Sequence, residues 1–376
     1  MKIVADDKIP FLKGVFEPFA DINYIPGAKI TNADIKNADA LIIRTRTKCN
    51  KDLLNNTTVK FIATATIGYD HIDTDYCKQK SIEWTNAPGC NSGSVQQYIL
   101  AALFFIANKH QFSLPEKTIG IIGVGNVGKK VENFARKLGM KVLLNDPPRA
   151  KVEGNAHFVS LEEIIQKSDI ITLHVPLTYE GPHKTFHLFN EFKLNKLPNH
   201  IFLINTSRGE VVDNAALKKH LTENKIAGCV LDVWENEPAF DKELLDMVDI
   251  GTPHIAGYSF DGKANGTAMS VKSVSKYLNL GLDSWYPDLS KFNENLTIDI
   301  VLKKYTKMKL IQQISNTIYS IKEDDIRLRE NPDNFENLRG SYPVRREMFN
   351  YIIKIKNIDN ETLKFLTNFN LKINAV

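Results

Sequence analysis

The chain has 376 residues, of which 43% are hydrophobic and 24% charged, a composition typical of a soluble protein with two or three domains. Basic residues exceed acidic ones by only four, and no long basic run or basic stripe with interleaved aromatic residues occurs, so nucleic-acid binding is not favoured. The longest apolar run, Ile99 to Ala107, is far shorter than the roughly 20 residues that span a bilayer, so no membrane segment is expected.

Cysteine usage is sparse and scattered, with Cys49, Cys77, Cys90 and Cys229 far apart in the chain. Neither the close pairs of a metal site nor the density of a disulfide scaffold is present, so no metal is expected. The first residues also lack the apolar core of a secretory signal. A reducing compartment, the cytoplasm, fits these features best.

The first hundred residues alternate short apolar runs with polar stretches. The runs Lys2–Ala5, Ala40–Ile43 and Phe61–Thr64 are typical of strands in a parallel sheet, which predicts a small flavodoxin-like α/β domain. The residues from Gly93 to His110 predict a long, well-buried helix that leads into the next domain.

The following segment, from Thr118 to Asp146, has the pattern of a strand, a glycine-rich turn, a helix and a second strand. Gly123 permits the tight turn, Gly125 lets the backbone approach a pyrophosphate, and Gly128 lets the helix pack closely on the strand. Asp146 follows the second strand about where a ribose 2′-hydroxyl needs an acceptor, and its charge would repel a 2′-phosphate. The pattern therefore predicts a dinucleotide site that favours NAD, although such turns also occur in ordinary strand-to-helix connections.

Further strands of this second domain are predicted at Ile170–His174, Ile201–Asn205 and Gly228–Val233. The apolar spacing from Met269 to Leu282 predicts a helix that returns to the first domain.

From Asp288 onward the pattern changes, and no glycine fingerprint recurs. Helices are predicted within Leu310–Arg329 and Asn360–Phe369, with a strand at Tyr351–Ile355. So small an α+β domain has a marginal core, and because burial against a second copy would help, we expect a homodimer. The predicted domains are a substrate domain (1–93 plus 258–287), an NAD-binding domain (94–257) and a C-terminal dimerisation domain (288–376).

Three polar clusters follow predicted strand ends, where an open α/β sheet binds its ligand. They contain Arg208, Glu237 and His254. An arginine can hold a substrate carboxylate, an imidazole can take a hydroxyl proton, and a carboxylate can orient that imidazole, so the three suit oxidation of a 2-hydroxy acid. Taken singly, each has an ordinary alternative as a surface ion pair, a solvated acid or a loop histidine.

Five motifs in this order resemble the D-isomer-specific 2-hydroxyacid dehydrogenases. They are Gly120–Gly128, His174–Thr178, Asn205–Asp213, Leu231–Pro238 and Thr252–Gly257. The resemblance implies a Rossmann-type, doubly wound parallel sheet as the cofactor domain, and NAD as the cofactor. It also implies that Arg208, Glu237 and His254 are catalytic, with His254 as the general acid/base.

The same resemblance implies contacts to cofactor and substrate. The expected NAD-binding residues are Gly123, Gly125, Asn126, Val127, Gly128, Asp146, Val175, Thr206, Ser207, Arg208, Asp232 and Gly257. The expected substrate-binding residues are Thr45, Thr66 and Tyr258. Thr45 stands where the family pattern has Ser, and Gln97 where many relatives have Glu, which affects substrate fit more than chemistry.

A narrower set of motifs is similar to one branch of the family, whose substrate is a phosphorylated 2-hydroxy acid, and extends the resemblance over nearly the whole chain. These motifs are Ile42–Thr45, Ala63–His71, Asn86–Cys90, Asp146–Arg149, Glu180–Thr185, Leu338–Arg339 and Tyr342–Glu347. A phosphoglycerate dehydrogenase-like enzyme and a non-catalytic, NAD-sensing corepressor are the alternatives. The tail lacks a clear βαββαβ regulatory pattern, which speaks against the first, and the retained Arg208, Glu237 and His254 speak against the second.

The phosphate-binding residues are not identified by any motif. Arg44 and Arg46 follow a predicted strand, and Arg345 and Arg346 lie in the tail, so these four are the candidates. For His71, His174, His183 and His187, packing or loop hydrogen bonds are the preferred roles.

Overall fold

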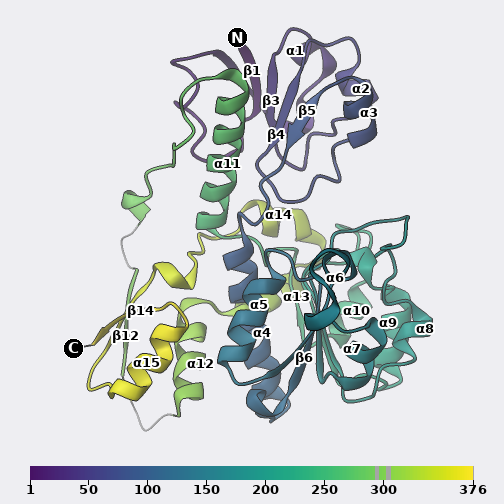
Figure 1. Cartoon of the computed structure of the whole chain (residues 1–376), viewed down its shortest axis with the longest axis vertical. Coiled ribbons are helices and arrows are strands. Elements are labelled where there is room, and N and C mark those ends of the chain that lie inside the picture. Colours follow the sequence, from purple (N-terminus) through teal and green to yellow (C-terminus); the bar gives the residue numbers. More distant parts are fainter. Residues whose placement is uncertain (293–295, 302–305, 376) are drawn as a thin grey trace. The chain divides into compact units, whose positions relative to one another are not determined.

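The computed structural model describes residues 1–292, 296–301 and 306–375. It contains two compact units, one formed by Met1–Asn91 and Ser259–Glu294, the other by Ser92–Tyr258 and Asn295–Val376. Each unit is built on a parallel sheet with helices (Figure 1). Among the described residues, no helix is long and apolar enough to cross a membrane. The predicted division into three functional domains stays a prediction.

Unit 1 contains a five-stranded parallel sheet in the order β2-β1-β3-β4-β5, which is the flavodoxin-like order and confirms the predicted fold. Its strands are β1 (Lys2–Asp6), β2 (Asp21–Ile25), β3 (Ala40–Ile43), β4 (Phe61–Thr64) and β5 (Glu83–Thr85). Its helices are α1 (Asn32–Ile35), α2 (Lys51–Leu54), α3 (Thr74–Gln79) and α11 (Phe260–Leu278). Alternate residues of the strands contribute to two apolar clusters, so both faces of the sheet are buried.

Helix α11 corrects the helix predicted at Met269–Leu282, because it begins at Phe260 and ends at Leu278. Its first half is poor in large apolar residues, so the apolar spacing does not reveal it. Gly266 packs so tightly that an added Cβ would lie 2.6 Å from the Ala65 carbonyl oxygen. Ser259 caps the start of the helix by accepting a hydrogen bond from the Gly262 amide at 2.8 Å.

Unit 2 contains a six-stranded parallel sheet in the order β11-β10-β9-β8-β6-β7. Its strands are β6 (Thr118–Ile122), β7 (Lys141–Asn145), β8 (Ile170–Leu173), β9 (Phe202–Asn205), β10 (Gly228–Leu231) and β11 (Ile250–Gly251). Its helices are α4 (Ser92–Lys109), α5 (Gly128–Lys137), α6 (Pro147–Glu153), α7 (Leu161–Lys167), α8 (Glu191–Leu194), α9 (Asn214–Thr222) and α10 (Lys242–Met247). The doubly wound sheet and the long helix predicted near Gly93–His110 are both confirmed.

The chain changes direction across the sheet between β6 and β8, so this is the switch point where doubly wound sheets bind ligands. Val159 lies beside β7, with its amide donating to the Leu144 carbonyl at 2.8 Å. This segment takes the place of the third strand in the usual dinucleotide-binding order 3-2-1-4-5-6.

The rest of unit 2 is a C-terminal module, which we define as the segment from β12 to β14. Its strands, β12 (Thr297–Ile300), β13 (Ile352–Ile355) and β14 (Lys372–Ala375), form a parallel sheet, of which only β13 was predicted. Its helices are α12 (Lys307–Ile318), α13 (Ile321–Glu330), α14 (Phe335–Gly340) and α15 (Asn360–Asn368). The single helical stretch predicted at Leu310–Arg329 is broken because Tyr319 is extended, with φ −148° and ψ 119°.

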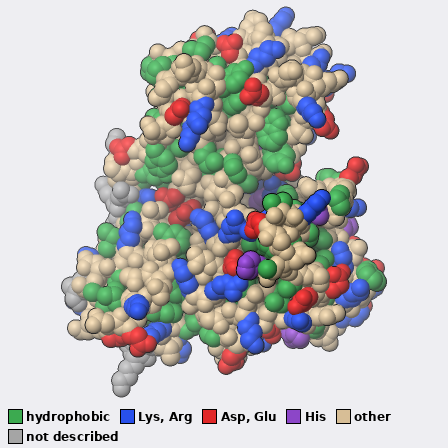
Figure 2. Space-filling view, viewed as in Figure 1, with side chains coloured by type: hydrophobic (Ala, Val, Ile, Leu, Met, Phe, Trp, Pro, Cys, Tyr) green, Lys and Arg blue, Asp and Glu red, His purple; other side chains and the backbone are tan. Residues whose placement is uncertain are grey.

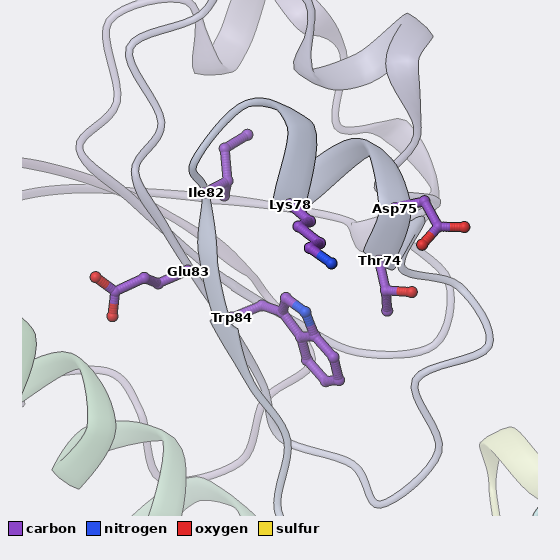
Figure 3. Close-up of a pocket in the computed structure, with 6 residues that line it drawn as sticks. All are labelled: Thr74, Asp75, Lys78, Ile82, Glu83 and Trp84. Atoms are coloured by element: carbon purple, nitrogen blue, oxygen red, sulfur yellow. The ribbon is translucent and has the colours of Figure 1, made fainter.

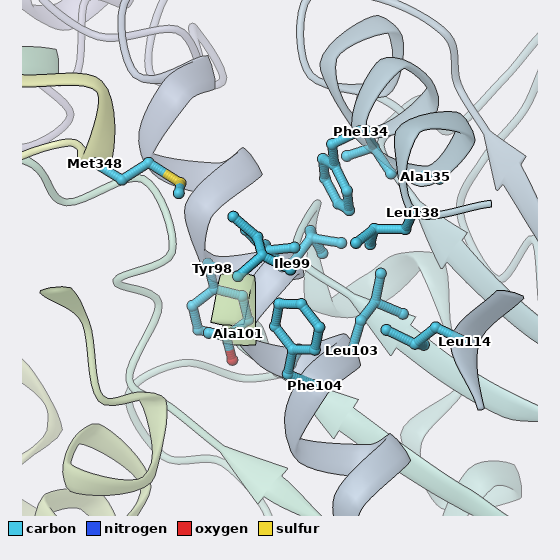
Figure 4. Close-up of a cluster of buried hydrophobic side chains, with 14 of the residues drawn as sticks. Tyr98, Ile99, Ala101, Leu103, Phe104, Leu114, Phe134, Ala135, Leu138 and Met348 are labelled. Carbon is cyan, nitrogen blue, oxygen red and sulfur yellow. The ribbon is translucent and has the colours of Figure 1, made fainter. Parts of the chain in front are cut away.

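One apolar core joins the C-terminal module to the six-stranded sheet. Helix α4 lies at its centre, and Tyr98, Phe104, Phe134 and Met348 are among its buried side chains (Figure 4). The module is therefore packed onto unit 2 through a continuous hydrophobic core.

Candidate functional site

The glycine turn after β6 has the geometry that a dinucleotide requires. Gly123 has φ +86°, and an added Cβ there would lie 2.5 Å from the His174 carbonyl oxygen. A Cβ on Gly128 would lie 2.1 Å from the Gly123 carbonyl oxygen, whereas one on Gly125 would meet nothing within 4 Å. The turn therefore needs glycine at two positions for packing, and it leaves the third open for a phosphate to approach.

Asp146 lies directly after β7 and is tied to this turn. Its Oδ2 accepts from the Val124 amide at 2.8 Å, and its Oδ1 accepts from the Arg149 amide at 3.1 Å. Arg149 pairs with Glu153 and donates to the Val124 carbonyl, so its guanidinium is already engaged. A carboxylate held here, with the nearby arginine engaged, suits a ribose hydroxyl better than a 2′-phosphate.

The other expected cofactor residues lie at the carboxyl ends of the same sheet. Asn126 is exposed and Val127 half-buried just before α5, and Val175 packs against the Gly123 turn after β8. After β9, the Ser207 amide and hydroxyl donate to Asn205 Oδ1 at 3.0 and 2.8 Å. Thr206 Oγ1 lies 3.4 Å from His174 Nδ1, and desolvation lowers the pKa of His174 to about 3, which keeps this ring neutral.

The three predicted catalytic residues follow three adjacent strands. Arg208 follows β9, Glu237 follows β10 and His254 follows β11, and all three side chains are partly buried. Arg208 Nη1 donates to the Ser207 carbonyl at 2.8 Å. Because all the strands are parallel, the three predicted catalytic residues and the glycine turn lie at the same edge of the sheet.

Glu237 and His254 form a direct pair. His254 Nδ1 lies 2.8 Å from Glu237 Oε2, and Glu237 Oε1 accepts from the Trp234 amide at 3.0 Å. Burial alone would raise the pKa of Glu237, but the positive charge and hydrogen bond of His254, the Trp234 amide and Arg339 outweigh it, so the pKa is lowered. With Nδ1 engaged by a carboxylate, His254 has Nε2 to exchange a proton with a substrate.

Asp232 positions the loop that carries His254. Its side chain is 1% exposed, and it accepts from Thr252 Oγ1 at 2.7 Å, the Ile255 amide at 2.7 Å and the Ala256 amide at 2.9 Å. Burial raises the pKa of Asp232, against the lowering effect of His254 and these hydrogen bonds. Asp232 was predicted as an NAD contact, and its role in holding this loop was not.

The expected substrate residues are divided between the units. In unit 1, Thr45 is exposed after β3, and Thr66 Oγ1 lies 2.7 Å from Thr64 Oγ1. In unit 2, Tyr258 and Gly257 are half-buried just after the His254 loop, and the Arg339 guanidinium lies 5.7 Å from the Tyr258 ring centre. Their substrate and cofactor contacts stay predictions.

The two phosphate candidates of the tail, Arg345 and Arg346, are buried, each with 6% exposure, which does not suit that role. Arg345 donates to the carbonyls of Ile255 and Ala256 at 3.0 and 2.7 Å. The histidines considered earlier have local contacts, such as His187 Nε2 at 2.7 Å from Glu235 and His71 Nε2 at 3.2 Å from Thr64.

A separate depression of about 470 Å³ lies on α3 and β5 of unit 1 (Figure 3). Thr74, Lys78 and Trp84 are among its lining residues, and no predicted site residue is. Within the described ranges, no group of three His, Cys, Asp or Glu residues is placed to hold a metal ion.

Comparison with known proteins agrees with this geometry. Residues 104–256 match the NAD-binding domain of D-isomer-specific 2-hydroxyacid dehydrogenases, and residues 294–367 match a domain of unknown function. The erythronate-4-phosphate dehydrogenase of Bacteroides thetaiotaomicron is 50% identical over 95% of this chain and 100% of its own length. The erythronate-4-phosphate dehydrogenase of Shigella dysenteriae is 41% identical, over 92% of each chain.

Solved structures are similar over about three quarters of this chain. D-lactate dehydrogenase from Aquifex aeolicus, complexed with NAD and lactic acid, has a TM-score of 0.61 at 30% identity and covers 74% of this chain and 96% of its own. The NAD-bound 3-phosphoglycerate dehydrogenase of Entamoeba histolytica has a TM-score of 0.64 at 26% identity and covers 77% of this chain and 98% of its own.

The fold, the glycine turn and these similarities define an NAD-dependent dehydrogenase that acts on a CH–OH group. The chain belongs to the D-isomer-specific 2-hydroxyacid dehydrogenases, within the group of erythronate-4-phosphate dehydrogenases. The similarity to that group over nearly the whole chain, C-terminal module included, separates it from the phosphoglycerate dehydrogenase-like alternative.

The lowered pKa of Glu237 predicts a pH-dependent effect of Glu237→Gln. A carboxylate with a lowered pKa stabilises the fold above its unfolded-state pKa, and this stabilisation is lost as the pH falls through the folded-state value. At pH 7, losing one charged hydrogen bond should lower the free energy of unfolding by about 1.5–3 kcal/mol. Urea unfolding should show this difference shrinking below the ordinary Glu pKa of 4.5; a constant difference down to strong acid would contradict it.

Proposed function

We propose that the protein oxidises 4-phospho-D-erythronate to (R)-3-hydroxy-2-oxo-4-phosphooxybutanoate in vitamin B6 biosynthesis, in the cytoplasm. The observation that carries the proposal is the Glu237–His254 pair, 2.8 Å apart, on the carboxyl edge of the NAD-binding sheet. The relatives that are similar over more than nine tenths of the chain are erythronate-4-phosphate dehydrogenases, which supports this substrate. All four cysteines are buried free thiols, which suits a reducing compartment.

The residues present fit NAD, because Gly125 leaves room for a phosphate and Asp146 offers an acceptor at the end of β7. NAD, when bound, accepts the hydride from C2 of the substrate. Arg208 would hold the substrate carboxylate through paired donors, and His254 would remove the C2 hydroxyl proton at Nε2. Glu237 then stabilises the imidazolium that forms, because its carboxylate faces Nδ1.

The assay that tests this function compares 4-phospho-D-erythronate with 3-phosphoglycerate as substrate for the purified protein. We expect NADH formation with the first, and kcat lower by about 10²–10⁴-fold in His254→Ala, with the Kd for NAD within twofold of the wild type. His187→Ala is the matched control, because His187 is also a partly buried imidazole 2.7 Å from a carboxylate, that of Glu235. Preference for 3-phosphoglycerate would overturn the substrate, and equal loss of activity in both variants would overturn the role of His254.

The substrate phosphate is proposed to bind Arg44 or Arg46, which flank Thr45 after β3. Arg44 is half-buried and donates to the Lys8 carbonyl at 3.2 Å, and Arg46 is exposed. Replacing the phosphate ligand by Ala should cost about 1.5–3 kcal/mol of substrate binding, a roughly 10- to 150-fold rise in KM for the phosphorylated substrate, with KM for NAD unchanged. Arg136→Ala, in a surface pair with Glu132, is the control. Unchanged KM in both Arg44→Ala and Arg46→Ala would reject the assignment.

The C-terminal module is proposed to hold a homodimer. It carries apolar side chains that are strongly exposed, including Val301 at 70%, Val344 at 69% and Ile352 at 42%. Removal of the tail near Asp288 is a poor test, because it would expose the core shared with α4. Sedimentation equilibrium of the intact chain should show a dimer that Val344→Asp or Ile352→Asp weakens, while Phe192→Asp on α8 does not. A monomer at micromolar concentration would refute the proposal.

A further inference from the structure

The backbone of the two residues that follow His254, Ile255 and Ala256, is hydrogen-bonded to side chains through both its amides and its carbonyls. The amides of Ile255 and Ala256 donate to the buried carboxylate of Asp232 at 2.7 and 2.9 Å. The carbonyls of the same two residues accept from Arg345 Nη2 at 3.0 and 2.7 Å. The backbone next to His254 is thus fixed by two buried, oppositely charged side chains.

Arg345 belongs to the C-terminal module, about ninety residues further along the chain. Ser94 Oγ at the start of α4 is a third acceptor near the same Nη2, whose two hydrogens are shared among the three, and Ser94 Oγ in turn donates to the Ala256 carbonyl at 2.7 Å. The arginine therefore connects three separate segments: the module, the start of α4 and the His254 loop.

The surroundings of Arg345 keep it charged and in place. Its guanidinium carbon lies 4.5 Å from the ring centre of Tyr319 and 5.6 Å from that of Tyr342, whose hydroxyl accepts from Nη1 at 3.4 Å. Both tyrosine hydroxyls donate to Asp324, at 2.9 and 2.6 Å. Burial alone would lower the pKa of Arg345, but Tyr342, Tyr319, Asp324 and Asp232 outweigh it and raise the pKa.

His254, which precedes Ile255 and Ala256, has an uncommon backbone conformation. His254 has φ +55°, a left-handed conformation that a non-glycine residue keeps only when its surroundings impose it. Its own amide donates to the Asp232 and Thr252 carbonyls at 2.7 and 3.0 Å. The hydrogen bonds to Asp232 and Arg345 then fix the backbone of the two residues that follow, so the direction of the imidazole depends on them.

We propose that Arg345 is a positioning residue for His254, through which the C-terminal module sets the geometry of proton transfer. The predicted effects on kcat and on the isotope effect rest on the proposed function, whereas the predicted effect on amide exchange in the loop does not. A lysine at this position keeps the charge but lacks the planar guanidinium that lies near the Tyr319 ring and donates to the Tyr342 hydroxyl through Nη1, so its ammonium is not held against the two carbonyls in the same way. Arg345→Lys should therefore loosen the loop without removing the buried charge.

The matched control is Arg329→Lys. Arg329 lies in the same module, pairs with Asp325 at 2.9 Å and donates to the carbonyls of Leu245 and Val248 at 2.6 and 2.9 Å. It is thus an arginine that binds two backbone carbonyls outside the His254 loop. Both replacements change a bond between the module and backbone carbonyls. Arg329 acts near Gly251, through Asp325, whereas Arg345 bonds Ile255 and Ala256 directly.

Hydrogen exchange of residues 252–258 and steady-state kinetics test the proposal. In Arg345→Lys, the Ile255 and Ala256 amides should exchange at least tenfold faster, and kcat should fall about 10- to 100-fold, with the Kd for NAD within twofold. The kinetic isotope effect with substrate deuterated at C2 should rise, because misplaced catalytic groups make the chemical step limiting. Partial unfolding alone would lower kcat without changing the isotope effect. Arg329→Lys should match the wild type in the isotope effect and in loop exchange.

Wild-type exchange in the 252–258 segment and a wild-type isotope effect in Arg345→Lys would overturn the proposal. If Arg345→Lys does not fold, Tyr342→Phe replaces it, since this removes the hydroxyl that accepts from Arg345 Nη1, and a smaller change in the same direction is expected. Failure of the wild-type protein to oxidise 4-phospho-D-erythronate would refute the proposed function alone, because the exchange measurement needs no substrate.

Discussion

The hydrogen bonds to the buried carboxylate of Asp232 hold together the carboxyl edge of the six-stranded sheet, where the proposed catalytic residues lie. Asp232 lies directly after β10 and accepts hydrogen bonds from the side chain of Thr252 and the amides of Ile255 and Ala256, all in the loop after β11. Removing this acceptor would leave the buried amides of Ile255 and Ala256 without their partner, each at a cost of about 1–3 kcal/mol. Two adjacent strand ends are therefore held in one arrangement, and Glu237 on the first meets His254 on the second.

The parallel sheet explains why one edge serves both the cofactor and the chemistry. Every strand of the six-stranded sheet ends at the same edge, and the chain changes direction between β6 and β8. The glycine turn after β6 and the proposed catalytic residues after β9, β10 and β11 must therefore lie on that edge. Local contacts then set the pKa of individual groups. The pKa of Glu237, for example, is lowered by His254 and the Trp234 amide, although burial acts in the opposite direction.

The parts of the fold and site that could be predicted from sequence are those with a local cause. The glycine turn was predicted because the demands on Gly123, Gly125 and Gly128 arise within a few residues. Glu237 and His254 were found because each follows a buried strand. The start of α11 was missed because small residues pack there against Ala65, and β12 and β14 were missed because they are short and mostly exposed. The contacts of Arg345 join residues about ninety apart, and no spacing in a single sequence reveals such a pair.

The C-terminal module and the loop that carries His254 share one hydrophobic core, which is built around α4. Helix α4 is apolar on nearly all sides, which is typical of a helix buried between two layers. One layer is the NAD-binding sheet with α5, and the other is the module with α12 and Met348 (Figure 4). Because Ser94 at the start of α4 and Arg345 in the module bind the same Ala256 carbonyl, the packing of α4 sets where these two donors meet. The contacts among Ser94, Ala256 and Arg345 are buried within unit 2. The visible surface carries charges of both signs (Figure 2), and these contacts are not part of it.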